Sequence, residues 1–157
     1  VEARGVPQDG AAGVFLLLKD TLELLEQSEN VQDILPILFR LRLASQQGYA
    51  PALTACVSCG KKDFDHAGFL VSEGTIVCPD CVSGRGNIVE ISGKSLDVLR
   101  QVQEVSPLHW HFLTSGSSEE TCEVLLPAER RECARAVDGF VQYHLGLTWD
   151  RGRFRRM

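Results

Sequence analysis

The chain has 157 residues, of which 44% are hydrophobic and 24% are charged, so it can form one domain with its own core, or one domain carrying a small insert. The net charge of −5 excludes a surface that attracts nucleic acid as a whole, and any DNA contact has to come from a local basic patch. We find no apolar run of membrane-spanning length and no secretory signal pattern, which predicts a cytoplasmic protein with no membrane contact.

The first predicted helix spans residues 14–27, after a glycine-rich stretch over residues 1–13 that is expected to be irregular. Apolar side chains recur in the helix at steps of three and four residues, which places them on one face. We expect this face to be buried: Phe15, Leu18, Leu22 and Leu25. Three more leucines widen the apolar surface, so burial on more than one side is predicted: Leu16, Leu17 and Leu24.

A second helix is predicted over residues 31–47, and it forms an antiparallel helical hairpin with the first. Pro36 fits its first turns, where a missing N–H is tolerated. Gly48 fits the position just beyond its C-terminus, where a left-handed backbone is common. Arg40 and Arg42 lie in this helix, ahead of the cysteine pairs described next, and they are candidates for a basic patch.

Two Cys-x-x-Cys pairs follow, Cys56 with Cys59 and Cys78 with Cys81, separated by eighteen residues. This spacing is typical of a zinc ion held by four thiolates, because each pair forms a tight turn that directs both sulfurs at one ion. A zinc ion with four thiolate ligands has no open position for water, so we expect a structural role. Two local disulfides, four free thiols or a zinc-dependent thiol redox switch are the alternatives.

The chain between the two cysteine pairs predicts a β-hairpin, with strands over residues 68–72 and 75–78 and a turn at Glu73-Gly74. After the second pair, Gly84-Arg85-Gly86 is expected to be a flexible loop, and residues 88–91 a short extended segment. A module of this size lacks a core of its own, so the zinc ion is expected to hold it against the helices.

Two more helices are predicted over residues 95–104 and 127–145, with a polar loop over residues 114–121 between them. Pro127 suits the first position of the final helix, and Gly146 ends it. The inner face of that helix is expected to carry Cys133, Val137, Phe140 and His144.

Together these elements predict a mainly α fold. A helical bundle is formed by residues 14–53 and 92–149, and a four-cysteine zinc ribbon is inserted over residues 54–91. Residues 1–13 and 150–157 are expected to be flexible ends.

Catalysis is not predicted, because no phosphate-binding loop, dinucleotide fingerprint, nucleophile elbow or His-Glu metalloprotease motif occurs. His109 and His111 would point the same way from a strand, but no nucleophile or carboxylate accompanies them at a recognisable spacing. We therefore expect the two histidines to be surface or partly buried residues that flank Trp110 and take no part in chemistry. Cys122 and Cys133 are expected to be reduced, buried thiols, and a disulfide between them is the alternative.

Three basic clusters stand out against the acidic average and predict local contacts with phosphate or with an acidic peptide. The first is Lys61 with Lys62, beside the first cysteine pair. The others lie on the last helix and in the C-terminal tail: Arg130, Arg131, Arg135, Arg151, Arg153, Arg155 and Arg156. A stand-alone nucleic-acid-binding zinc ribbon is a further alternative, which the net charge and the lack of a row of aromatic side chains disfavour.

Leu-Phe-Arg-Leu-Arg-Leu over residues 38–43 is followed by Gly-Tyr-Ala-Pro-Ala-Leu over residues 48–53 and then by the first cysteine pair. This string resembles the C-terminal region of the bacterial RecO family of recombination mediators, and the second cysteine pair stands at the distance expected for that family. The end of the chain is similar too, with a helix that carries Phe140, Tyr143, His144 and Leu145 before an arginine-rich tail.

The resemblance implies a non-enzymatic role in DNA repair and recombination. Proteins of this family help to load the RecA recombinase onto DNA coated by single-strand-binding protein (SSB), work with RecR, and hold the acidic SSB tail that ends in phenylalanine. We expect that tail to bind near Arg130, Arg131 and Arg135, beside an apolar pocket.

Family members also begin with an oligonucleotide-binding barrel. No strand-rich region precedes Val14 in this chain, which starts at Val1. Single- or double-stranded DNA is therefore expected to bind mainly through the absent barrel, and the protein is expected in the bacterial cytoplasm, associated with the nucleoid.

Overall fold

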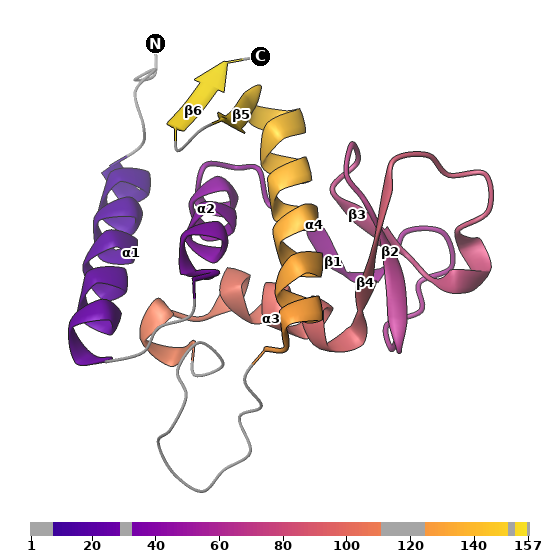
Figure 1. Ribbon diagram of the computed structural model, residues 1–157, viewed down its shortest axis with the longest axis horizontal. Helices are drawn as coiled ribbons and strands as arrows, with labels where there is room; N and C mark the ends of the chain where they lie inside the picture. Colours follow the sequence, from indigo (N-terminus) through magenta and orange to yellow (C-terminus); the bar gives the residue numbers. More distant parts are fainter. Residues whose placement is uncertain (1–7, 29–32, 111–124, 151–152, 157) are drawn as a thin grey trace, which may run out of the picture.

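The computed structural model describes residues 8–28, 33–110, 125–150 and 153–156. Within these ranges the fold is mainly α, as predicted, with four helices and a small four-stranded sheet. Figure 1 shows α1, α2 and α4 side by side, α3 crossing below them, and the sheet beyond α4. The bounds are α1 Gln8–Gln27, α2 Leu35–Gln46, β1 Ala52–Cys56, β2 His66–Leu70, β3 Thr75–Val77, β4 Ile88–Ser92, α3 Gly93–Glu104 and α4 Pro127–Leu145.

Helix α1 packs on the core through a different face from the predicted one. Its buried side chains are Leu17, Thr21 and Leu24, and the Thr21 hydroxyl is satisfied because it donates to the Leu17 carbonyl at 2.6 Å. The expected inner face is exposed instead: Phe15, Leu18, Leu22 and Leu25. The apolar side chains of the helix form one broad arc, and α2 and the 3-10 turn η2, Pro107–His109, cover only the part around Leu17, Thr21 and Leu24, so the predicted burial on more than one side is wrong. The helix also starts at Gln8, inside the stretch expected to be irregular.

Helix α2 starts at Leu35, later than the predicted residue 31, because residues 33–34 form a turn. Its end follows the prediction, with a left-handed Gly48 (φ +92°) beyond it, and Pro36 lies in its first turn. Its arginines, however, are used inside the fold. Arg42 donates through Nη1 to the carbonyls of Val102, at 2.9 Å, and Val105, at 3.3 Å, and so caps the C-terminus of α3. Burial lowers the pKa of Arg42. Arg40 pairs with Asp138 of α4 at 2.8 Å, so the prediction that these two arginines join a basic patch is wrong.

The sheet has the strand order β1-β3-β2-β4. Strand β2 is antiparallel to both β3 and β4, and the predicted β2–β3 hairpin is confirmed, with Gly74 (φ +64°) in its turn. Strand β1, which the sequence analysis does not anticipate, adds to the hairpin in parallel with β3. The inner face of the sheet and the helices share one core, which includes Phe69, Ile76, Ile91, Leu38, Leu99, Trp110 and Val137.

A carboxylate joins α3 to α4. Glu132 of α4 accepts hydrogen bonds from the Ser92 N–H at 3.1 Å, the Ser92 hydroxyl at 2.9 Å and the Ser95 hydroxyl at 2.6 Å. Burial opposes ionisation of Glu132, but these three donors outweigh it and lower the pKa of the carboxyl group. The start of α3 is therefore fixed to α4 by a charged acceptor, which complements the positive end of the α3 dipole.

Helix α4 also lies against the β2–β3 hairpin. A Cβ atom on Gly74 would stand 2.8 Å from Cε2 of Phe140, and one on Gly139 would stand 3.2 Å from Cγ1 of Val71. The contact therefore depends on glycine at both positions. Gly146 (φ +62°) ends the helix, as predicted.

The end of the chain forms a second, two-stranded sheet. Strand β5, Leu147–Asp150, pairs antiparallel with β6, Arg153–Arg156. Part of the tail that we expected to be flexible is thus a hairpin strand. Among the described residues, none of the helices has the length and apolar character needed to cross a bilayer.

Candidate metal centre and cationic surface

The four predicted cysteines come together at one end of the sheet. The sulfur atoms of Cys56, Cys59, Cys78 and Cys81 all lie within 4.8 Å of one another. Cys56 ends β1, and Cys59 lies in the turn that follows. Cys78 directly precedes a short 3-10 turn, η1, Pro79–Cys81, and Cys81 is its last residue. The set can hold one tetrahedrally coordinated metal ion.

Backbone hydrogen bonds shape the two turns around these sulfurs. The Gly60 N–H donates to the Cys56 carbonyl at 2.9 Å, and Gly60 has the positive φ (+79°) that was predicted for this turn. The Cys81 N–H donates to the Cys78 carbonyl at 3.0 Å, and the Val57 N–H donates to the Ile76 carbonyl at 2.9 Å. The last bond fixes the first turn to β3, which leads into the second.

The thiols influence one another's ionisation. Burial alone would raise the pKa of Cys56, but the backbone N–H groups of Cys78, Cys59 and Ser58 stabilise its thiolate, and the pKa falls to about 6. The hydrogen bond with the Cys78 sulfur, followed by burial, raises the pKa of Cys81 to about 12. Four neighbouring thiols therefore do not all ionise together unless a cation compensates the charge.

Arg85 lies over the first cysteine turn. Its Nη2 donates to Oγ of Ser58 at 2.8 Å, and its Nη1 lies 3.6 Å from Oε1 of Glu73. The loop that was expected to be flexible is therefore held across the metal centre by its arginine. In the sequence, Arg85 is only a single basic residue between two glycines, and this gives no indication that it contacts Ser58.

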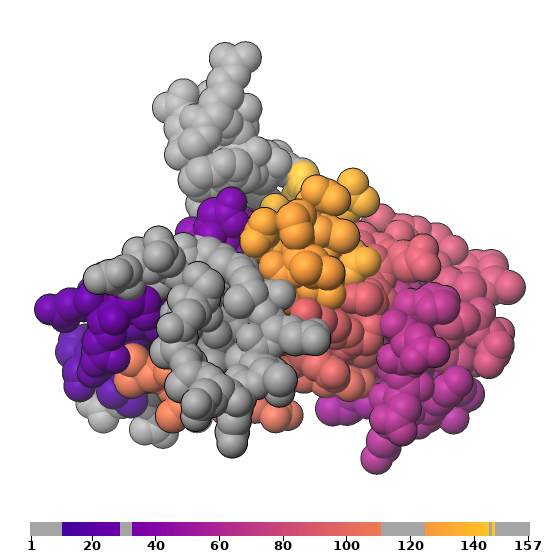
Figure 2. Space-filling model, turned by 60° about the horizontal axis from the view of Figure 1, so that its bottom comes forward, coloured from indigo at the N-terminus to yellow at the C-terminus, as the bar shows by residue number. Residues whose placement is uncertain are grey.

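The predicted arginines of α4 are partly available for a ligand. Arg131 and Arg135 are exposed and one helical turn apart. Arg130 is half-buried, and its Nη1 donates to the Leu125 carbonyl at 3.4 Å. Leu126, at the start of the same helix, is 59% exposed. Figure 2 shows α4 (orange) open to solvent on the face turned toward the viewer.

The tail arginines stay a prediction. Arg151 lies outside the described residues, and only the backbone of Arg153, Arg155 and Arg156 is described, as part of β6.

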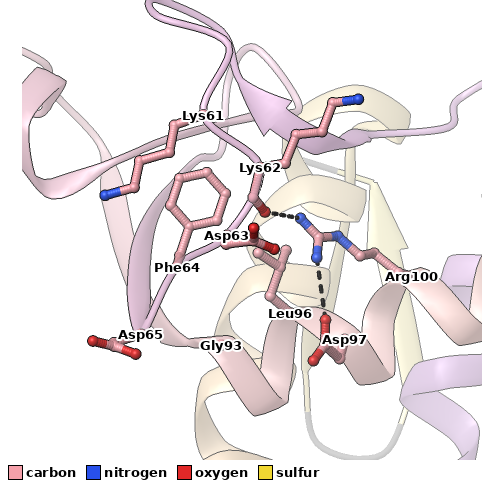
Figure 3. Close-up of a pocket in the computed structure, with 9 residues that line it drawn as sticks. All are labelled: Lys61, Lys62, Asp63, Phe64, Asp65, Gly93, Leu96, Asp97 and Arg100. Carbon is pink, nitrogen blue, oxygen red and sulfur yellow. Dashed lines mark hydrogen bonds and ion pairs between the residues drawn. The ribbon is translucent and has the colours of Figure 1, made fainter.

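Lys61 and Lys62 border a pocket of about 270 Å³ between the segment after the first cysteine turn and α3. Figure 3 shows the two lysines pointing in opposite directions, while Arg100 bonds to the Lys62 carbonyl and to Asp97. The lining also carries Asp63 and Asp65. The lining thus carries three cationic side chains and three carboxylates. Because these charges balance, the pocket does not favour an anionic ligand.

Among the remaining candidate residues, the structure describes His109, Cys133 and His144. His109 is exposed, and His111 and Cys122 lie outside the described residues. Cys133 is fully buried, as predicted, and burial raises the pKa of its thiol to about 12. His144 is half-buried against the ring of Phe140, with a centroid separation of 4.4 Å.

The family model described as "Recombination protein O C terminal" matches residues 6–153. A DNA repair protein RecO from Nitratidesulfovibrio vulgaris is 47% identical over 163 residues, which cover all of this chain and 61% of that protein. The proteins of the same name from Oleidesulfovibrio alaskensis and Lawsonia intracellularis are 43% and 38% identical, and each match covers all of this chain and 60% of the relative. The chain thus spans about three-fifths of the length of these curated relatives.

Proposed function

This chain belongs to the Recombination protein O C-terminal family, and we propose that it is the partner-docking part of a DNA repair and recombination mediator. In this proposal the chain is not an enzyme. It binds the acidic C-terminal tail of SSB on α4, and one structural zinc ion stabilises the fold. Contact with RecR is part of the same proposal, whereas single- or double-stranded DNA is bound mainly by parts of longer family members. This role places the protein with the nucleoid in the bacterial cytoplasm.

Two features support zinc as the bound ion: the four thiolate donors and the distances between their sulfur atoms. A tetrahedron with Zn–S bonds of about 2.3 Å places the sulfurs about 3.8 Å apart, and the Cys59 and Cys78 sulfurs are 3.7 Å apart. Four thiolates leave no position for water or substrate, so the ion supplies stability and no catalysis. Because Cys56 ends β1 and Cys78 follows β3, the ion would tie together the two strands that pair in parallel.

Replacing Arg85 by alanine is expected to speed the loss of zinc about tenfold. Zinc with four thiolates carries a net charge of −2, and Arg85 places a cation beside it while holding Ser58 of the first turn. The measurement is the rate of zinc transfer to a chromogenic chelator. Lys61→Ala is the matched control, because it removes another cation beside the same turn without touching the Ser58 contact, and equal rates in the two variants would contradict the expectation.

The tail-binding proposal is carried by Arg131 and Arg135, which expose two cationic groups on one turn of α4. An acidic peptide ending in phenylalanine needs cations for its carboxylates and an apolar contact for its ring. Leu126 offers apolar surface on the same helix, and the N-terminal end of a helix favours negative charge.

Exchange of both arginines for glutamate (Arg131→Glu, Arg135→Glu) is expected to weaken binding of a labelled acidic peptide ending in Asp-Phe at least tenfold, because attraction becomes repulsion. Fluorescence anisotropy at fixed salt measures the affinity, and a peptide without its last Phe tests the apolar contact.

The control for this pair is Lys61→Glu with Lys62→Glu, which changes the net charge equally at the mixed-charge pocket. An equal loss in both double variants would indicate general electrostatics and no specific site on α4. Tight binding of the peptide without Phe would contradict recognition of the tail end.

A further inference from the structure

The four cysteines of the metal centre differ in how far they are open to solvent. Cys56 and Cys78 are buried, Cys81 is half-buried, and Cys59 is exposed. The space beside Cys59 is open as well, because a Cβ atom on Gly60 would meet no atom within 4 Å. A small oxidant that arrives from solution therefore reaches the centre first at the sulfur of Cys59.

The sulfur of Cys59 has a close neighbour in the other cysteine pair. It lies 3.7 Å from the sulfur of Cys78, which is 19 positions away in the chain, and a disulfide needs the two atoms to approach to about 2.05 Å. A bridge between Cys59 and Cys56 would instead close a ring within one tight turn, and strained disulfides of that kind are readily reduced. The bridge between the two turns is therefore the more stable product.

We propose that hydrogen peroxide converts the metal centre into a Cys59–Cys78 disulfide and releases the ion, an inference that rests on the zinc site of the proposed function. The Cys59 thiolate attacks one peroxide oxygen, the O–O bond breaks, and hydroxide leaves. The Cys78 thiolate then attacks the sulfur of the resulting sulfenic acid, and a second hydroxide leaves as the S–S bond forms. Two electrons thus pass from the two thiolates to the peroxide, which ends as two hydroxide ions.

The disulfide takes the place of the ion as the link between two strands. Cys59 lies in the turn after β1 and Cys78 directly follows β3, so the bond joins the same parallel pair of strands that the ion would tie together. Only Cys56 and Cys81 remain as ligands, and two thiolates do not complete a tetrahedral site. The oxidised chain therefore loses zinc but keeps its fold, because the new covalent loop restricts the unfolded state. A thiol reductant restores the four thiolates, which makes the centre a reversible sensor of peroxide.

The test treats the zinc-loaded chain with hydrogen peroxide while a chromogenic chelator reports the zinc that is released. The remaining thiols are then alkylated, and mass spectrometry of the peptides identifies the cysteines that are bridged. Cys133 is the internal control, because it is a buried thiol outside the four-cysteine set and should stay reduced. Urea unfolding compares the oxidised, zinc-free chain with the same chain after reduction in excess chelator.

We expect one zinc ion released for each disulfide formed, a peptide pair linked through Cys59 and Cys78, and a urea midpoint that falls when the bridge is reduced in chelator. Zinc that stays bound while free thiols in the same solution are oxidised overturns the proposal. A bridge between any other two cysteines, or a chain that unfolds on oxidation, also overturns it. A chain that holds no zinc before the peroxide is added contradicts the proposed zinc site itself, so the two failures are distinguishable.

Discussion

Replacing Cys78 by serine is expected to abolish stoichiometric zinc binding and to lower the free energy of unfolding by about 4 kcal/mol or more. Cys78 is 1% exposed and packs with Cys56, Leu70 and Val77 in a small cluster beneath the metal centre. Because that cluster has few members, we expect the strands β1 and β3 to depend on a bound ion for much of their mutual stability. A serine hydroxyl is a poor ligand for zinc, and it would be buried where a thiolate stood.

Zinc content after gel filtration and urea unfolding followed by circular dichroism measure the two effects. Cys133→Ser is the control, since Cys133 is buried on α4, outside the four-cysteine set. That variant should keep one zinc ion per chain. Full zinc content in Cys78→Ser, or unchanged stability after the metal is stripped from the unaltered chain, would contradict a structural zinc site.

Trp110→Ala is expected to destabilise the helical part by about 3–5 kcal/mol. Trp110 is fully buried in the main core, and its indole N–H donates to the Val105 carbonyl at 3.2 Å. The same carbonyl also accepts from Arg42, so the tryptophan helps to close the C-terminus of α3 against α2. Its removal leaves a large cavity at that junction.

The matched variant Trp110→Phe keeps most of the apolar volume and loses the hydrogen bond, so its expected loss is smaller, about 1–2 kcal/mol. Urea unfolding at constant zinc concentration measures both variants. Similar losses in the two would mean that the hydrogen bond, and not the packed volume, carries the effect.

Strong local signals made some elements predictable from the sequence. The ends of α4 follow from Pro127 and Gly146, and the four cysteines follow from their spacing, because each signal resides in adjacent residues. The buried face of α1 is the opposite case. Apolar side chains extend over about half of its circumference, and only the position of α2 and η2 decides which part is covered.

Contacts between distant residues account for the other differences. Strand β1 pairs with β3 in parallel across the metal site, and Ala-Leu-Thr-Ala-Cys alone carries little strand preference. The Arg85–Ser58 contact joins residues 27 positions apart. The Arg42 contacts join residues 60 and 63 positions apart. Neighbours in the chain do not reveal such contacts, which is why Arg42 was predicted to join a basic patch and Arg85 to lie in a flexible loop.

The paired glycines between α4 and the β2–β3 hairpin have a consequence for recognition. With Gly74 against Phe140 and Gly139 against Val71, no intervening layer of side chains can rearrange to change the distance between helix and hairpin. The arginines of α4 and the four-cysteine end of the sheet therefore belong to one rigid unit. A partner that touches both meets them at a fixed separation, and it gains affinity without the entropic cost of aligning them, whereas a partner of different dimensions is rejected by geometry alone.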